Sequence, residues 1–443
     1  MALGNGKLTI KNKNIHPLLP GSILESQLRY QDTMSIPRVA LILDIDNTFR
    51  MQDGSLEPIS RYLAASLYSS HIPLIFSTGL PFLLDRSVYN PVFLSVWERI
   101  QSGDLPYASA VYSDVGTSRF ILHQDMSGKK KYKPDNLYKN HLVSLGFNRH
   151  AIVKHLQILS SQSFFQKYQF HFQDPSGESK FLLGQNSPSE PFKVSAYFFA
   201  RNPKDSLILR DKIRSLFPNL LVSTGLEINY QSLHPHATPQ KYWLDILPLD
   251  KHQALYDLRR LLNLSIVIAA GDSPNDETLL IQDEDLRGQP DLLSSALDLS
   301  IIVGGAQNFL LQAAKDHLSP IPSLSRITPE FYSIRLPDGR QKFYYLESGN
   351  RLGPHSIEYA LRIFFEHIIN CNHPCSSGSL VSRQITSIKK FYKTAKIYLD
   401  YSHFISQSSS VPKQAAAKRL MGQITNPEEI QSSLKKSLKF LYS

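Results

Sequence analysis

Residues 39–48 read VALILDIDNT, and these ten residues indicate the fold class. Its first five residues, Val39–Leu43, are all apolar and follow Pro37, as expected of a parallel strand that is buried on both faces. Ligands of open α/β sheets bind beyond the carboxyl ends of such strands, where Asp44 and Asp46 lie. Side chains two residues apart on an extended backbone point the same way, so both carboxylates can converge on one reacting group. An Asp-rich turn is also common as plain turn or helix-cap chemistry, so the motif needs support from elsewhere in the chain.

Two more segments carry groups that bind phosphate. The apolar run Pro73–Phe76 is followed by Ser77, Thr78 and Gly79, so a second predicted strand ends in a hydroxyl and a glycine. The Thr78 hydroxyl and the Gly79 N–H can both donate to a phosphate oxygen. Lys251 opens a run with leucines at helical spacing, which predicts that its ammonium lies near a helix N-terminus, where anions are favoured.

A fourth segment follows another predicted buried strand. The apolar residues Ile266–Ala270 precede GDSPND at 271–276, which contains Asp272 and Asp276. Acidic oxygen ligands at a strand end suit a hard cation such as Mg²⁺. Each segment alone has an ordinary interpretation as a turn or a solvated lysine. Taken together, the four segments predict one phosphate site at the carboxyl edge of a sheet.

The ordered set DIDNT, STG, Lys251 and GDSPND resembles the four motifs of haloacid dehalogenase-like phosphatases. The resemblance spans roughly residues 36–370. More narrowly, EPFKVS at 190–195, SDVGT at 113–117 and LDILP at 244–248 are similar to segments of sucrose-phosphate phosphatases, which have a type IIB cap.

The resemblance implies a catalytic role for each motif residue. Asp44 is expected to be the nucleophile that takes the phosphoryl group as an aspartyl-phosphate. Asp46 is expected to be the acid/base that protonates the leaving alkoxide and then activates water. Thr78, Gly79 and Lys251 are expected to bind the phosphoryl oxygens.

The resemblance also implies a Mg²⁺ site. Its expected ligands are the Asp44 carboxylate, the Asp46 backbone carbonyl and the Asp272 carboxylate. Asp276 is expected to orient Lys251 or a metal-bound water. Mg²⁺ and the lysine would supply the positive charge that lets a carboxylate approach a phosphate dianion.

Asp46 also favours a phosphatase over a dehalogenase, because hydrolysis of a phosphate ester needs a second carboxylate to protonate the leaving group.

Two residues depart from the family pattern. Leu80 stands where many relatives carry Arg, and His252 follows the motif lysine where Gly is common. Neither departure removes a catalytic atom.

The order of the motifs predicts the fold class and the domains. We expect a doubly wound, Rossmann-like parallel α/β core over residues 36–82 and 246–369. The segment between them is too long for a loop and is expected to form an inserted α+β cap of type IIB over residues 83–245. Residues 1–35 would be an N-terminal extension, and residues 370–443 a helical, basic C-terminal extension. In the latter, NPEE at 426–429 predicts the start of a helix. We expect this helix to dock on the core, with a membrane surface or a partner as the alternatives.

A cap of this kind excludes water and carries specificity, because the core recognises only the phosphate. Ser113 and Lys193 are candidate contacts to a sugar hydroxyl, with His234 or His236 as further candidates. The expected function is Mg²⁺-dependent hydrolysis of a sugar phosphate similar to sucrose 6-phosphate. The alternatives are a glycosyl-phosphoglycerate, trehalose phosphate or another small-metabolite phosphate, or a non-catalytic interaction module.

Composition agrees with a cytoplasmic enzyme of two or three domains, since 42% of the 443 residues are apolar. No leader-like start and no run of about 18 apolar residues occurs, so neither export nor a membrane span is expected.

Two cysteines, Cys371 and Cys375, exclude a disulfide-dense scaffold and make a poor zinc motif. The net charge of +10 includes KKKYK at 129–133, interpreted as an exposed basic hairpin or loop in the cap rather than a nucleic-acid site. The sequence leaves the oligomeric state open.

Overall fold

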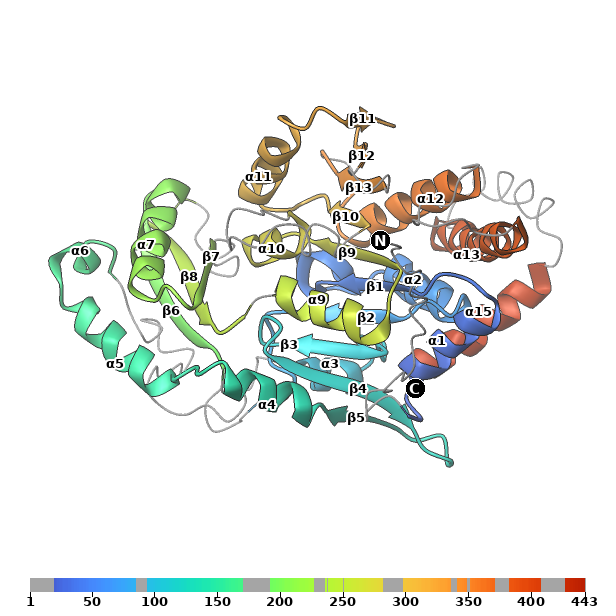
Figure 1. Ribbon diagram of the computed structural model, residues 1–443, viewed down its shortest axis with the longest axis horizontal. Coiled ribbons are helices and arrows are strands. Elements are labelled where there is room, and N and C mark those ends of the chain that lie inside the picture. Colours follow the sequence, from blue (N-terminus) through green and yellow to red (C-terminus); the bar gives the residue numbers. More distant parts are fainter. Residues whose placement is uncertain are drawn as a thin grey trace, which may run out of the picture.

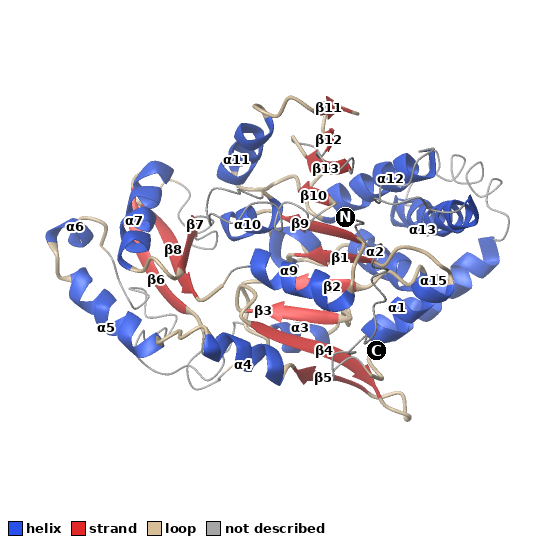
Figure 2. Ribbon diagram, in the orientation of Figure 1, coloured by secondary structure: helices blue, strands red, loops and turns tan. Residues whose placement is uncertain are grey.

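The computed structural model describes residues 20–84, 94–169, 192–226, 236, 238–249, 251–281, 298–335, 341–348, 351–370, 382–407 and 427–442. Within these residues, a large sheet with helices on both faces forms the core, and a smaller sheet lies to one side of it (Figures 1 and 2). The expected α/β core with a parallel sheet is therefore confirmed.

The core sheet has ten strands in the order β11-β12-β13-β10-β9-β1-β2-β3-β4-β5. The strands from β13 to β3 in this order run parallel, and antiparallel strands extend both ends of the sheet. The parallel strands are β13 (Gln341–Leu346), β10 (Leu299–Ile302), β9 (Ile266–Gly271), β1 (Val39–Leu43), β2 (Leu74–Ser77) and β3 (Ala110–Ser113). The flanking strands are β11 (Leu324–Arg326), β12 (Phe331–Arg335), β4 (Ser118–Gln124) and β5 (Lys130–Pro134).

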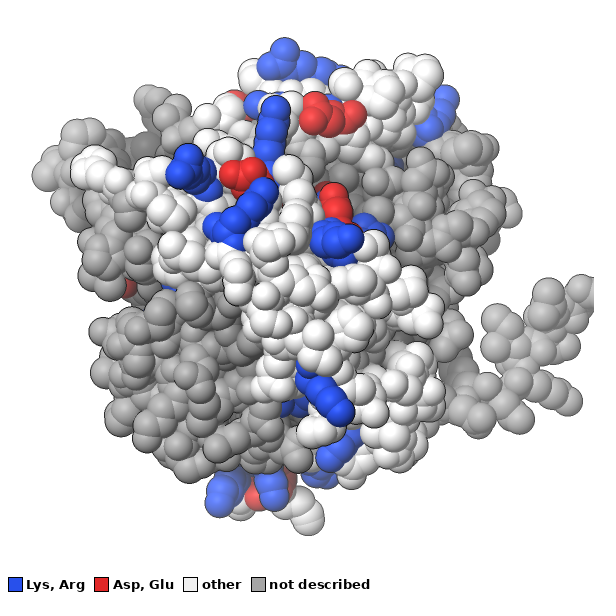
Figure 3. All heavy atoms as spheres, turned by 90° about the vertical axis from the view of Figure 1, so that its left-hand side faces the viewer, with Lys and Arg blue, Asp and Glu red and all other residues white. Residues whose placement is uncertain are grey.

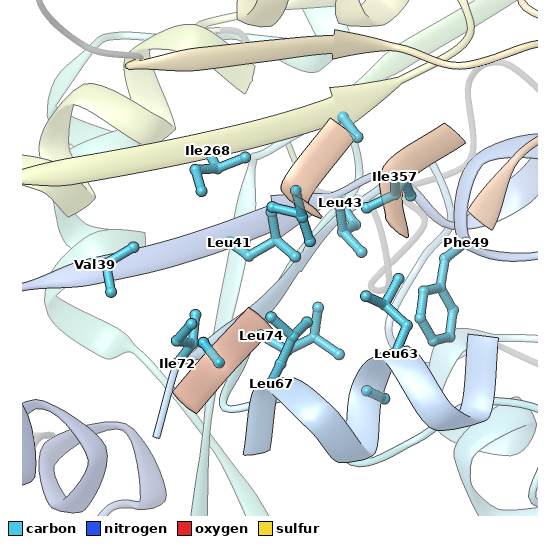
Figure 4. Close-up of a cluster of buried hydrophobic side chains, with 14 of the residues drawn as sticks. Val39, Leu41, Leu43, Phe49, Leu63, Leu67, Ile72, Leu74, Ile268 and Ile357 are labelled. Carbon is cyan, nitrogen blue, oxygen red and sulfur yellow. The ribbon is translucent and has the colours of Figure 1, made fainter. Parts of the chain in front are cut away.

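Strand β1 is buried on both faces, as its unbroken apolar run predicts. Val39, Leu41 and Leu43 point to one face, where Figure 4 shows them packed with side chains of helix α2 (Pro58–Ser69). The same face is covered by α3 (Val96–Gln101), α12 (Pro354–Asn370), α13 (Ser382–Gln407) and α15 (Pro427–Tyr442). The opposite face is covered by α1 (Ile23–Thr33), α4 (Asn136–Ser144), α9 (Lys251–Leu262), α10 (Glu277–Leu280) and α11 (Asn308–Leu318).

The smaller sheet has three antiparallel strands in the order β6-β8-β7. Along β6 the side chains alternate between buried and half-buried, which is the pattern of a sheet with one covered face. Its core cluster also includes residues of the helices inserted in the same part of the chain. These elements are β6 (Val194–Ala200), β7 (Leu221–Leu226), β8 (Gln240–Leu247), α5 (Arg149–Ser160), α6 (Ser163–Gln166) and α7 (Pro203–Leu216).

The expected start of the cap at residue 83 is wrong. Strands β3, β4 and β5 all lie in the core sheet, because β3 pairs with β2 and the other two follow as an antiparallel extension. Helix α4 packs on the same sheet through Tyr138 and Leu142. The small sheet and its helices therefore belong to the part of the chain between residues 145 and 247.

The described parts of the two terminal extensions pack on the core as well. In α1, the Gln31 side-chain amide donates to Val39 O (3.1 Å) and accepts from Val39 N (2.9 Å), which fixes the helix beside β1. Helix α15 buries Leu434 and Leu441 in the same cluster as α2. The predicted docking of the last helix on the core is thus confirmed, and its lysines at 435, 436 and 439 are exposed. Asn426, Cys371 and Cys375 lie outside the described residues.

The KKKYK segment is placed in the core sheet and not in the cap, which corrects the expectation. Lys130 begins strand β5, and its ammonium donates to Phe440 O at the end of α15. It also lies 4.0 Å from the ring centroid of Tyr107, whose N–H donates to Leu441 O (2.9 Å). Lys130 therefore binds the carbonyl end of a helix, where cations are favoured, whereas Lys129, Lys131 and Lys133 are exposed on the hairpin of β4 and β5.

On the face formed by the inserted elements, Lys and Arg side chains are scattered among acidic and uncharged residues (Figure 3). Among the described residues, no helix is long and apolar enough to cross a membrane.

Leu434→Ala is expected to lower the free energy of unfolding by about 2–5 kcal/mol, because it removes a buried side chain between α15 and α2. Urea unfolding measures this effect. Leu137→Ala is the matched control, since Leu137 is 52% exposed and its truncation should change stability by less than about 0.5 kcal/mol. Equal effects in the two variants would contradict the docking of α15.

Candidate active site

A buried lysine joins acids from two of the predicted motifs. The Lys251 ammonium donates to Asp44 Oδ1 (2.8 Å) and to Asp276 Oδ1 (2.6 Å). Lys251 is the first residue of α9, and Asp44 directly follows β1, where its N–H donates to Ala270 O of β9 (3.0 Å). The side chains of Lys251 and Asp276 are fully buried, and that of Asp44 is 9% exposed. Three motifs far apart in the sequence therefore meet at the carboxyl ends of β1 and β9.

Asp276 is held by several donors besides the lysine. Its Oδ2 accepts hydrogen bonds from the N–H of Asp272, the N–H of Ser273 and the Ser273 hydroxyl, each at 3.2 Å. Gly271 allows this close approach, because a Cβ there would lie 2.4 Å from Asp276 Cγ. With both oxygens occupied, Asp276 is arranged to position Lys251 and the turn after β9.

Asp272 is oriented by two residues of the turn after β1. Asn47 Nδ2 donates to Asp272 Oδ2 (2.8 Å), and Thr48 Oγ1 donates to Asp272 Oδ1 (3.2 Å). Asn47 adopts a left-handed backbone with φ of 58°, which asparagine tolerates better than most residues. The same amide also donates to Gly305 O (3.1 Å), so the turn is fixed between two loops.

The charges at this site favour a bound cation. Carboxylate oxygens of Asp44, Asp272 and Asp276 all lie within 4.8 Å of one another, and only one ammonium is bonded to them among the described residues. Burial raises the pKa of Asp44 well above its usual value and that of Asp272 to about 7. Burial lowers the pKa of Lys251, but Asp276 and Asp44 together raise it above its usual value, so the side chain stays an ammonium. Oxygen ligands with excess negative charge fit a hard divalent cation.

The hydroxyl–glycine motif after β2 lies beside these acids. Thr78 is buried, and its Oγ1 accepts from the N–H of Leu80 (3.1 Å), which leaves its own hydrogen to donate. A Cβ on Gly79 would lie 3.5 Å from Asn275 Nδ2, so this loop is next to the GDSPND segment. Leu80 packs against the hydrophobic core. The side chain of His252 lies outside the description.

Asp46 differs from the other acids in its surroundings. Its side chain is 48% exposed, and its Oδ1 accepts from Arg99 Nη1 (2.9 Å) and Arg50 Nη1 (3.3 Å). The backbone of both Asp44 and Asp46 is extended, with ψ of 160° and 137°. Asp46 is therefore the accessible carboxylate beside the buried cluster.

The candidate substrate residues fall in different places. Ser113 is fully buried at the end of β3 and donates to Asp114 Oδ2 (3.1 Å), so its position gives no support to a sugar contact. Lys193 precedes β6, and its ammonium donates to Gly79 O (3.3 Å), which connects the inserted sheet to the loop after β2. His236 is exposed, and His234 lies outside the described residues.

Sequence reasoning did not find Asn47, Thr48, Arg50 and Arg99. The first two stand inside the DIDNT motif but donate to Asp272 of the GDSPND segment, so a search for polar groups that could orient the acids of the other motifs would have found them. Arg99 lies 53 residues from Asp46, on a helix whose placement the local sequence does not indicate.

No family model and no curated protein matches the sequence. Among solved structures, the chain is similar to a HAD subclass IIB sugar phosphatase, with 11% identity, 63% of this chain and 96% of that chain covered, and a TM-score of 0.34. It is also similar to a haloacid dehalogenase-like hydrolase from B. subtilis, with 14% identity, 62% and 91% covered, and a TM-score of 0.31. A phosphatase of the same superfamily from Bacteroides thetaiotaomicron gives 12% identity, 62% and 87% covered, and a TM-score of 0.31.

Proposed function

We propose that this protein is a Mg²⁺-dependent phosphomonoester hydrolase that acts on a sugar phosphate through an aspartyl-phosphate. The observation that carries the proposal is the buried Lys251 ammonium bonded to Asp44 and Asp276, beside Asp272 and a half-exposed Asp46. This arrangement combines a nucleophilic carboxylate, an ammonium for phosphoryl oxygens and a second carboxylate that reaches solvent.

In the first step, an Asp44 carboxylate oxygen attacks phosphorus while the bond from phosphorus to the ester oxygen breaks. The leaving oxygen takes a proton from Asp46 and departs as the alcohol. Lys251 and the Thr78 hydroxyl hold the transferring oxygens by donating hydrogen bonds to them.

In the second step, Asp46 takes a proton from water as the water oxygen attacks the phosphorus of the aspartyl-phosphate. The bond between phosphorus and Asp44 breaks, which releases phosphate and restores the carboxylate. The carboxylates of Asp44 and Asp272 and the Asp46 backbone carbonyl would hold Mg²⁺, with Asp276 as their positioning residue. When bound, the cation neutralises charge on the carboxylate and phosphate oxygens.

The proposed substrate class is supported by the resemblance of residues 190–195 to sucrose-phosphate phosphatases. It is also supported by the inserted sheet, because the ammonium of Lys193, the residue before β6, donates to Gly79 O in the loop after β2. Phosphate release from a panel of sugar phosphates, including sucrose 6-phosphate, trehalose 6-phosphate and a glycosyl-phosphoglycerate, tests the proposal. We expect one glycosyl phosphate to be turned over with Mg²⁺. Release from none of them would favour the non-catalytic alternative.

Removal of Mg²⁺ with EDTA is expected to lower phosphate release by at least about 100-fold, and addition of Mg²⁺ should raise the melting temperature. Binding to the folded state alone adds about 2.7 kcal/mol at a concentration 100 times Kd. Calorimetric melting with and without Mg²⁺ measures this shift independently of activity. Asp272→Asn should abolish the shift, and Asp53→Asn, an exposed loop acid, should retain it. A shift that survives in Asp272→Asn would place the cation elsewhere.

A further inference from the structure

Two arginines contact the same oxygen of Asp46. Arg99 Nη1 lies 2.9 Å and Arg50 Nη1 3.3 Å from Oδ1. No other described residue contacts Oδ2, and the Asp46 side chain is 48% exposed. The carboxylate is thus held through one oxygen on a side chain that is half-exposed.

Arg99 is prearranged for this contact by its helix. Helix α3 begins with a capping box, in which the Ser95 hydroxyl accepts from Glu98 N (3.2 Å) and the Glu98 carboxylate accepts from Ser95 N (2.9 Å). Arg99 Nε donates to Leu94 O (3.3 Å), and the arginine side chain is only 15% exposed. Such a planar guanidinium loses little further freedom when it binds a carboxylate.

Arg50 is fixed in a comparable way. Its Nη2 donates to Gly54 O, and its side chain is 12% exposed. Arg50 comes from the turn that carries Asp46, whereas Arg99 comes from a separate helix. The Arg99 guanidinium therefore connects α3 to the turn after β1.

We propose that Arg99, with Arg50, is a positioning residue that holds Asp46 by Oδ1 so that Oδ2 exchanges the proton with the leaving oxygen and then with water. The inference rests on the proposed function, because it assigns a partner to the acid/base of that reaction. A half-exposed carboxylate on a turn has several rotamers, and proton transfer requires one of them. The two arginines select that rotamer before the substrate binds.

The test compares a substrate that needs protonation of its leaving group with one that does not. The first is the sugar phosphate with the highest turnover in the panel above, whose alkoxide leaves with a proton from Asp46. The second is p-nitrophenyl phosphate, whose phenolate is stabilised by the nitro group and leaves without one. The ratio kcat/KM reports the steps up to release of the alcohol, so it isolates this proton transfer from hydrolysis of the aspartyl-phosphate.

Arg99→Gln is expected to lower kcat/KM for the sugar phosphate by about 10- to 100-fold, part of the 10²–10⁴-fold that general acid catalysis provides. The value for p-nitrophenyl phosphate should change by less than about threefold. Arg99→Lys should recover part of the loss, because one cation returns without the planar fork.

Arg61→Gln is the matched control, since Arg61 donates to Gly103 O (3.3 Å) beyond α3 and does not contact Asp46. Its kcat/KM should equal that of the wild type for both substrates.

Asp46→Asn separates the two proposals. If it lowers kcat/KM equally for both substrates, the acid role proposed for Asp46, and with it the inference about Arg99, is wrong, whereas phosphate release by the wild type still supports a phosphatase. If Asp46→Asn is selective and Arg99→Gln is not, only the inference about Arg99 is overturned. Equal losses for both substrates in Arg99→Gln would instead mean that Arg99 contacts the phosphate or supports the fold.

Discussion

Asp44→Asn is expected to abolish phosphate release, with kcat reduced by at least about 10⁴-fold, the scale on which removal of a covalent nucleophile acts in other hydrolases. The amide has nearly the shape of the carboxylate, and its oxygen can still accept from Lys251 Nζ, which lies 2.8 Å from Asp44 Oδ1. Loss of the attacking oxyanion is then the main change. Initial rates with the sugar phosphate identified in the panel measure the effect.

Two further observations make this prediction specific. Rapid acid quenching of the wild type during turnover should give a fraction of protein heavier by one phosphoryl group, and Asp44→Asn should give none. Asp316→Asn, an exposed acid on α11, should retain full activity. Residual turnover of Asp44→Asn within tenfold of the wild type would rule out Asp44 as the nucleophile.

Lys251→Met is expected to remove activity and to destabilise the fold by about 3–5 kcal/mol, the usual cost of removing one partner from a buried ion pair. The ammonium is fully buried between Asp44 and Asp276, and its loss leaves negative charges facing one another. Because the proposed Mg²⁺ site uses the same acids, we expect saturating Mg²⁺ to stabilise Lys251→Met more than the wild type. Urea unfolding with and without Mg²⁺ measures both effects.

The matched control for the lysine is Lys396→Met on α13. Lys396 also pairs with an acid, Asp400, at 2.8 Å, but its side chain is 24% exposed. Pairs at i,i+4 on a helix contribute about 0.3–0.5 kcal/mol, so this variant should unfold close to the wild type. A double-mutant cycle of Lys251→Met with Asp276→Asn should show strong coupling, and additive losses would contradict the contact between them.

The sequence predicts those parts of the fold that depend on local pattern. Strand β1 is an unbroken apolar run, and its burial on both faces follows directly from this. The site is predictable for the same reason, because Asp44, Thr78 and Asp272 each follow a strand of one parallel sheet. Lys251 was placed correctly by its position at the start of a helix.

The sequence does not predict contacts that depend on distant pairing. Strand β3 is only four residues long, and its membership of the core sheet is set by its pairing with β2. Local propensity does not indicate which sheet a strand joins, so the expected start of the insert at residue 83 was too early in the sequence. Lys130 and Phe440 are 310 residues apart, and only the folded core brings them together.

The central position of β1 has a consequence for synthesis of the protein. One of its edges pairs with β2, which follows soon after it along the chain across helix α2, but the other pairs with β9, about 230 residues later in the chain. At roughly 5–20 residues per second, a ribosome makes that interval in about 10–50 s. During this time one edge of an apolar strand lacks its partner, which is the state that chaperones bind. The nascent chain can assemble the buried cluster of Asp44, Lys251 and Asp272 only when the segment that carries the last two residues has emerged.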